Sequence, residues 1–164
     1  MPRVTLPSAA AADAAADAWL ALDKQLCFGL YSASLAMTRI YKPLLAPLGL
    51  TYPQYLVMLA LWEQDGQTVG ALGARLALDS GTLTPLLKRL EAQGQVARER
   101  DAGDERRVIV RLTAAGRALK IQARAVPPHI AAATGCTLDE VAELTIRLAV
   151  LRDSLVREAD GVPH

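Results

Sequence analysis

The chain has 164 residues and 52% hydrophobic content, which is enough for one ordinary core and too little for a multidomain enzyme. Its 18 Lys and Arg nearly balance its 17 Asp and Glu, which excludes a supercharged nucleic-acid-binding tail and a disordered acidic segment. Any basic surface must therefore be local.

The two cysteines, Cys27 and Cys136, lie too far apart in the sequence for a disulfide framework, and neither histidine has ligands at metal-binding spacing. We therefore expect no metal and no cofactor. No apolar run approaches the roughly 20 residues that cross a bilayer. Asp13 and Asp17 interrupt the Ala-rich start where a signal peptide has its apolar core. These observations predict a soluble, cytoplasmic protein with no membrane partner.

The first half of the chain predicts two helices after an Ala-rich extension, residues 1–18, to which we assign no function. A long helix is expected from Trp19 to Tyr41. Tyr41-Lys42-Pro43 should break or bend it, because proline disfavours the helical conformation of the residue before it. Thr51-Tyr52-Pro53-Gln54 combines an N-cap, a proline in the first turn and a glutamine at the capping-box position. A core helix over residues 52–63 follows from this pattern.

The middle of the chain predicts a winged helix-turn-helix. Thr68 should cap a short helix that ends at residue 76, and a second helix is expected from about Ser80 to Gln93 after a three-residue turn. Pro85 lies inside this second helix unless the helix starts near Thr82. Two strands joined by turn residues form the wing, at residues 96–100 and 106–112.

Two helical segments should follow the wing. Thr113 caps one, which Pro127-Pro128 should interrupt, and Thr137-Leu138-Asp139-Glu140 opens the last as a capping box. The terminal helices are apolar and no sheet covers them, so they should pack against each other and against a second copy. We expect a mainly α fold with a winged module at residues 51–113 and dimerisation helices, at 19–50 and 114–160, that intertwine in a homodimer.

The basic residues are concentrated around the predicted wing. Ten basic and five acidic residues lie between Lys88 and Arg124, and such a local excess indicates nucleic acid as the partner. A helix of this type enters the major groove, while the hairpin reaches the minor groove or phosphates. A solvated surface on a protein-binding winged helix is the alternative. The candidate DNA-contacting residues are Ser80, Thr82, Thr84, Lys88, Arg89, Arg106 and Arg107.

Cys27 lies on a polar face of the first predicted helix. Phenols and hydroxyls can favour a thiolate by hydrogen bonding, so this face suits a reactive cysteine, although a small buried filler is the alternative. Tyr41 lies about 21 Å farther along a continuous helix, so it cannot contact Cys27 of its own chain without a sharp fold-back, and a partner chain could bring it, together with Tyr52, to the sulfur. The residues that share the face with Cys27 are Tyr31, Ser34, Thr38 and Tyr41.

Cys136 stands one residue before a predicted helix N-cap, near the favourable end of the helix dipole. This position suits a resolving thiol. An incidental loop cysteine is the alternative.

Four segments carry a family resemblance: residues 22–28 (LDKQLCF), 41–45 (YKPLL), 50–56 (LTYPQYL) and 78–91 (LDSGTLTPLLKRLE). They resemble the organic hydroperoxide resistance regulators, a branch of the MarR family of winged-helix repressors. Residues 104–108 (DERRV) fit the wing pattern of the wider MarR family. The resemblance covers roughly residues 20–155.

The resemblance implies a homodimeric repressor that binds a palindromic double-stranded operator when reduced and releases it when an organic hydroperoxide oxidises one cysteine per subunit. Cys27 would be the oxidised residue. Tyr41 and Tyr52 would reach its thiolate across the dimer, with Tyr31 nearby. Cys136 makes the chain similar to the members with two cysteines, which form a disulfide between subunits.

In the wing, the resemblance assigns Asp104 a bracing role and Arg106 a place in the minor groove. One alternative is a MarR-type repressor that a small aromatic ligand releases without covalent chemistry. Another is a thiol peroxidase, but no arginine lies on the Cys27 face to bind a peroxide. We therefore expect a regulator and not an enzyme.

Overall fold

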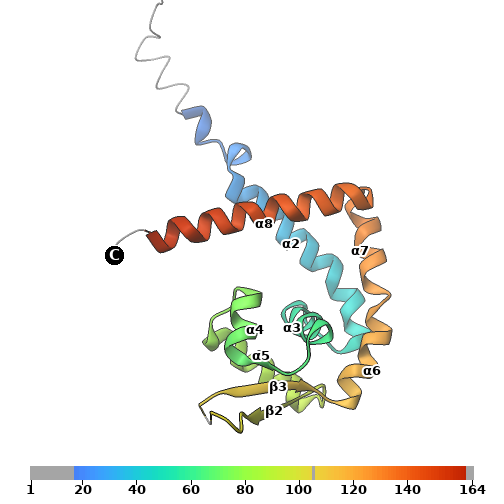
Figure 1. Cartoon of the computed structure of the whole chain (residues 1–164). Helices are drawn as coiled ribbons and strands as arrows, with labels where there is room; N and C mark the ends of the chain where they lie inside the picture. The colour runs from blue at the N-terminus through green and yellow to red at the C-terminus, as the bar shows by residue number, and fades with distance from the viewer. Residues whose placement is uncertain (1–16, 105, 162–164) are drawn as a thin grey trace, which may run out of the picture. The chain divides into compact units, whose positions relative to one another are not determined.

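The computed structural model describes residues 17–104 and 106–161 and is mostly helical, with one small antiparallel sheet (Figure 1). The mainly α winged-helix prediction is confirmed. Most of the predicted extension, residues 1–16, lies outside the described residues. The described part of the chain divides into two compact units, one up to Ile40 and the other from Tyr41 onward.

The first unit contains a short 3-10 helix, η1 (Leu22–Lys24), and most of helix α2 (Leu26–Leu45). The prediction of one unbroken helix from Trp19 was wrong, because Gln25 takes an extended backbone conformation between η1 and α2. The apolar side chains of α2 are largely exposed in the single chain, at 61% for Leu26 and 43% for Leu35.

Helix α2 continues past Tyr41 and ends at Leu45, so the break expected at Tyr41-Lys42-Pro43 was also wrong. Pro43 lies in the last turn, where its missing N–H removes one intrahelical hydrogen bond without stopping the helix. The chain then forms η2 (Ala46–Leu48) and turns at Gly49, whose φ of 66° favours glycine. Helix α3 (Tyr52–Glu63) follows, with the predicted capping box between Thr51 and Gln54.

Helices α4 (Val69–Leu76) and α5 (Ser80–Ala92) form the helix-turn-helix, and Thr68 caps α4 as predicted. The side chain of Asp79 caps α5, so the helix begins at Ser80 and Pro85 lies inside it. A start near Thr82 is therefore excluded. The proline is tolerated because the cap and the buried side chains of Leu83, Leu87 and Leu90 hold the helix in place.

The wing strands are β2 (Val96–Arg100) and β3 (Val108–Leu112), paired antiparallel from Val96↔Leu112 to Arg100↔Val108. A two-residue strand, β1 (Gln67–Thr68), pairs with the other edge of β3 and gives the strand order β1-β3-β2. Strand β1 was not predicted, because two residues carry no periodicity.

Three helices follow the wing: α6 (Ala114–Ala123), α7 (Val126–Thr134) and α8 (Leu138–Gly161). The helical run that begins after Thr113 is interrupted as predicted, between Ala123 and Val126, and Pro127 and Pro128 occupy the start of α7, where a proline loses no helical bond. Along α8 several apolar side chains are exposed, including Leu144, Ile146 and Val150. The division into a winged module and dimerisation helices stays a prediction.

The core of the second unit gathers side chains from α3, α4, α5, the sheet and α6. Its fully buried members include Leu45, Met58, Leu61, Leu72, Leu83, Leu87, Leu90 and Val110. Among residues 17–104 and 106–161, no single helix could span a membrane. The bent pair Leu26–Leu48 and Tyr52–Glu63 meets the length and composition criteria for a span.

Candidate functional site

The start of helix α5 carries three of the predicted DNA-contacting residues. Ser80 and Thr82 are exposed, and Thr84 is half-buried. The Thr82 hydroxyl donates to Asp79 Oδ2 (2.8 Å), and the Thr82 backbone N–H donates to Oδ1 (2.8 Å). These bonds, the hydroxyl first, hold the pKa of the Asp79 carboxyl below its usual value. Thr82 therefore stabilises the helix start as well as facing solvent.

Lys88 and Arg89 lie farther along α5 and are exposed, opposite the buried leucines of the same helix. A helix with one apolar face against the core and one hydroxylated and basic face toward solvent can enter the major groove of DNA. All five predicted residues of α5 are thus exposed or half-buried.

The wing turn is organised by two aspartates. The carboxylate of Asp104 accepts from the backbone N–H of Arg106 (3.1 Å) and from its Nε (3.2 Å). Asp101 Oδ1 accepts from the backbone N–H of Gly103 (2.9 Å), and its other oxygen lies 3.8 Å from Arg107 Nε. The Arg106 side chain is 92% exposed. Asp104 therefore fixes the backbone from which Arg106 extends into solvent.

An ion pair connects α5 to the wing. Arg98 Nε donates to Glu91 Oε2 (2.9 Å), and the Arg98 backbone N–H donates to Glu91 Oε1 (3.2 Å). The hydrogen bond from the Arg98 side chain is the main cause that lowers the pKa of Glu91. The sequence analysis counted both residues only as charges, because a pair between a helix and a strand has no fixed sequence spacing.

A groove of about 530 Å³ lies between α5, the start of α4 and the wing. Thr84 and Leu87 line it from α5, and Arg98, Arg106 and Arg107 line it from the wing side. Each of these three guanidinium groups is also paired with a carboxylate, so the groove combines cationic side chains with the acidic residues that position them.

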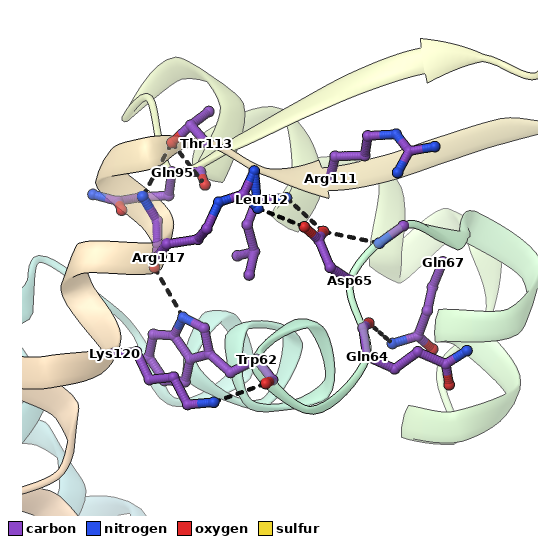
Figure 2. Close-up of polar contacts among 12 residues, drawn as sticks. Trp62, Gln64, Asp65, Gln67, Gln95, Arg111, Leu112, Thr113, Arg117 and Lys120 are labelled. Carbon is purple, nitrogen blue, oxygen red and sulfur yellow. Dashed lines mark hydrogen bonds and ion pairs between the residues drawn. The ribbon is translucent and has the colours of Figure 1, made fainter.

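A network around Asp65 anchors β3 and α6 to helix α3, as Figure 2 shows. Asp65 Oδ1 accepts from the backbone N–H groups of Gly66 and Leu112 (both 2.8 Å), and Oδ2 pairs with Arg117 (2.7 Å). In the same network Trp62 Nε1 donates to the carbonyl of Gly116 (2.8 Å). Sequence analysis missed Asp65, since Asp65-Gly66 is an ordinary turn pair.

Tyr41 and Tyr52 lie together, with ring centroids 4.5 Å apart. Tyr55 completes the cluster at 5.9 Å from Tyr41; it was not predicted, although it lies one helical turn after Tyr52. Burial first, and then the neighbouring phenols, raise the pKa of Tyr41 to about 12. Burial also raises the pKa of Tyr52. Both phenols therefore keep their protons at neutral pH and can donate hydrogen bonds to an anion.

Cys27 is an exposed free thiol in the first turn of α2, and Tyr31, one turn later, is 62% exposed. Farther along this face, the Thr38 hydroxyl donates to the backbone carbonyl of Ser34 (2.8 Å).

Cys136 is a half-buried free thiol between α7 and α8. Its backbone N–H donates to Thr134 Oγ1 (3.2 Å). The capping box that opens α8 follows it directly, with Thr137 and Glu140 bonded as predicted. Within the part of the chain that the structure describes, no group of His, Cys, Asp and Glu is arranged to hold a metal ion.

Comparison with known proteins identifies relatives of the whole fold. The family model described as transcriptional regulator SarA/Rot matches residues 39–122. The transcriptional regulator TtmR of Methylorubrum extorquens is 55% identical over 82% of this chain and 69% of its own length. The organic hydroperoxide resistance transcriptional regulator of Bacillus subtilis is 46% identical over 82% of this chain and 91% of its own length.

Solved structures of AbfR from Staphylococcus epidermidis are also similar. One is 38% identical, covering 83% of this chain and 94% of the other, with a TM-score of 0.71. AbfR has been solved in its reduced form bound to DNA and in a disulfide form. The resemblance to the organic hydroperoxide resistance regulators is confirmed by the Bacillus subtilis relative. The chain belongs to the MarR/SarA-type family of winged-helix transcriptional regulators.

Proposed function

We propose that the protein is a redox-sensing repressor that binds operator DNA when Cys27 is reduced. An organic hydroperoxide oxidises Cys27, and a disulfide with Cys136 of the other subunit then releases the DNA. A regulator of this kind acts in the cytoplasm. The related regulators support this function, since one is named for organic hydroperoxide resistance and another has reduced, DNA-bound and disulfide forms. They give no support to a thiol peroxidase.

The single observation that carries the proposal is the pair of half-buried phenols of Tyr41 and Tyr52, whose ring centroids lie 4.5 Å apart. Neighbouring phenols can donate hydrogen bonds, which an anion needs in order to remain charged in a half-buried place. A thiolate is such an anion, and the thiolate is the form of cysteine that reacts with peroxides.

The thiolate must come from another subunit. Cys27 and Tyr41 are separated by fourteen residues of helix α2, a rise of about 21 Å. Apolar side chains of α2 and α8 are exposed to water, and packing against the same helices of a second copy would bury them. A homodimer therefore buries these faces and brings Cys27 of one subunit to Tyr41 and Tyr52 of the other, with Tyr31 close to the sulfur.

The chemistry has two balanced steps. The Cys27 thiolate attacks one peroxide oxygen, the O–O bond breaks, and the other oxygen leaves and takes a proton as an alcohol. Sulfur thereby becomes a sulfenic acid and the peroxide is reduced by two electrons. The Cys136 thiol then attacks this sulfur, a disulfide forms, and the hydroxyl leaves as water.

DNA recognition is assigned to the exposed face of α5 and to the wing. Ser80, Thr82 and Thr84 approach the backbone or bases at the helix start, and Lys88 and Arg89 contact phosphates or guanines. Arg106, positioned by Asp104, enters the minor groove beside Arg107. The disulfide would move the start of α8 and so change the spacing of the two recognition helices, which must match half-sites about 34 Å apart.

The test uses a DNA duplex that the reduced protein selects from a random pool. Wild type should bind it in a gel-shift assay, lose it after one equivalent of cumene hydroperoxide, and form a covalent dimer on a non-reducing gel. Cys27→Ser should keep its DNA under peroxide, and Cys136→Ser should form no disulfide. If Cys27→Ser still releases DNA on adding peroxide, the proposal is wrong.

A further inference from the structure

A buried amide sits at the start of helix α3. Gln54 is 3% exposed, and its Oε1 accepts from the backbone N–H of Thr51 (2.8 Å) and from the Thr51 hydroxyl (3.0 Å). Because a backbone N–H can only donate, the amide oxygen of Gln54 is fixed on that side. The amide nitrogen must therefore point away from Thr51.

The amide nitrogen of Gln54 faces the end of helix α5. It donates to Oε1 of Gln93 at 3.4 Å, and Gln93 Nε2 donates to the carbonyl of Gly49 at 3.0 Å. A carbonyl only accepts, so the orientation of the Gln93 amide is also fixed. Gln93 is the C-cap of α5, and its backbone N–H donates to the carbonyl of Arg89 (3.0 Å). One chain of directed hydrogen bonds thus joins the connection before α3 to the end of α5.

The tyrosine cluster and this chain of hydrogen bonds both involve the first turn of α3. Tyr52 and Gln54 occupy the same first turn of α3, and the Tyr52 ring is 4.5 Å from that of Tyr41. At this same end of α5, two residues before Gln93, Glu91 ties the helix to β2 through Arg98. The amide pair therefore lies between the helix turn that carries Tyr52 and the end of α5 that holds the wing strand.

We propose that the Gln54–Gln93 amide pair is a positioning device that transmits the state of the tyrosine cluster to the recognition helix. This inference rests on the proposed function, in which the partner's thiolate binds the phenols. When the thiolate leaves, the first turn of α3 relaxes and the Gln54–Gln93 bond transfers that shift to the end of α5. At 3.4 Å this bond is the longest link of the chain, so its strength changes with a small displacement of either helix.

The test compares variants that remove the pair with a matched buried-amide variant. Gln93→Met removes both side-chain hydrogen bonds of Gln93, which is exposed, and leaves the capping box of α3 intact. This variant should therefore fold. Gln54→Met removes the same bridge from the other side. Gln67→Met is the control, because Gln67 is a buried amide at the opposite end of α3 that donates to the carbonyls of Ala60 (2.9 Å) and Gln64 (2.7 Å).

The measurement is the operator Kd of each variant before and after one equivalent of cumene hydroperoxide, with the disulfide quantified on a non-reducing gel. All variants should form the disulfide as wild type does. The ratio of oxidised to reduced Kd should fall about fivefold in Gln93→Met and Gln54→Met, the factor for one net hydrogen bond. Gln67→Met should keep the wild-type ratio.

The outcomes separate this inference from the proposed function. If wild type is not released by peroxide, both are wrong. If wild type is released and both bridge variants keep its Kd ratio, the transmission inference alone is wrong. An equal fall in the ratio of oxidised to reduced Kd in Gln67→Met would show general destabilisation and would also overturn the inference.

Discussion

Replacing Gly116 tests the close packing between α6 and the base of the wing. A Cβ at this position would lie 2.0 Å from the carbonyl oxygen of Gln95, where a carbon–oxygen contact needs about 3.3 Å. Gly116→Ala must therefore move the start of α6 by about 1.3 Å, given these contact distances. This shift should break three hydrogen bonds. They run from Thr113 N to Gln95 O (3.1 Å), from Thr113 Oγ1 to Gly94 O (2.6 Å) and from Trp62 Nε1 to Gly116 O (2.8 Å).

The expected loss of stability follows from these contacts. Three hydrogen bonds at about 1 kcal/mol each, less about 1 kcal/mol for the better helix propensity of alanine, leave a net loss of about 2 kcal/mol. Urea unfolding at fixed protomer concentration measures this value. Gly70→Ala is the control, since its Cβ meets nothing within 4 Å, and it should be neutral or slightly stabilising. If Gly116→Ala unfolds at the same urea concentration as wild type, the packing argument is refuted.

Three further changes test other parts of the fold. Ala77, at the turn between α4 and α5, has a φ of 53°, so Ala77→Gly should stabilise the protein by about 1 kcal/mol in the same urea assay, and a loss would contradict the argument. Arg98 lowers the pKa of Glu91 in the folded state. This pair therefore stabilises the fold at pH values above 4.5, the ordinary pKa of glutamate, and the stabilisation is lost as the pH falls through the lowered pKa. The thermal midpoint of Glu91→Gln should therefore lie below that of wild type at pH 7 and approach it near pH 3; a constant difference would exclude the pair as the cause. The pKa of Tyr41 is raised from 10.0 to about 12, so folding favours its protonated form and stability should fall as pH rises from 10 to 12. Tyr41→Phe should weaken this alkaline loss in thermal melts, and an unchanged pH profile would assign the titration to other groups.

Local chemistry made most helix starts predictable. Thr51, Thr68, Thr113 and Thr137 each cap a helix with a side chain that bonds within the next turn, so the signal lies within four residues. The prolines were harder to interpret. Pro43 and Pro85 both lie inside helices, because the cost of one missing hydrogen bond is offset by packing that a sequence window does not contain.

Long-range contacts account for what the sequence analysis missed in the candidate site. Asp65 bonds to residues 47 and 52 positions away, and Gln54 to one 39 positions away. Strand β1 exists only through its pairing with β3. Tyr41 and Tyr52, by contrast, were named from a helix face and the family resemblance, and they lie together because η2 and Gly49 turn the chain between them.

The ion pair between Glu91 and Arg98 also bears on the entropy of DNA binding. A hairpin that moved freely against α5 would lose that freedom on contact with a duplex, and the lost entropy would weaken affinity. Here the restriction is imposed during folding, because the guanidinium and the Arg98 backbone hold the strand to the helix before any ligand arrives. Helix and hairpin thus form one pre-organised surface, so under the proposed function little wing entropy is lost when the chain binds DNA.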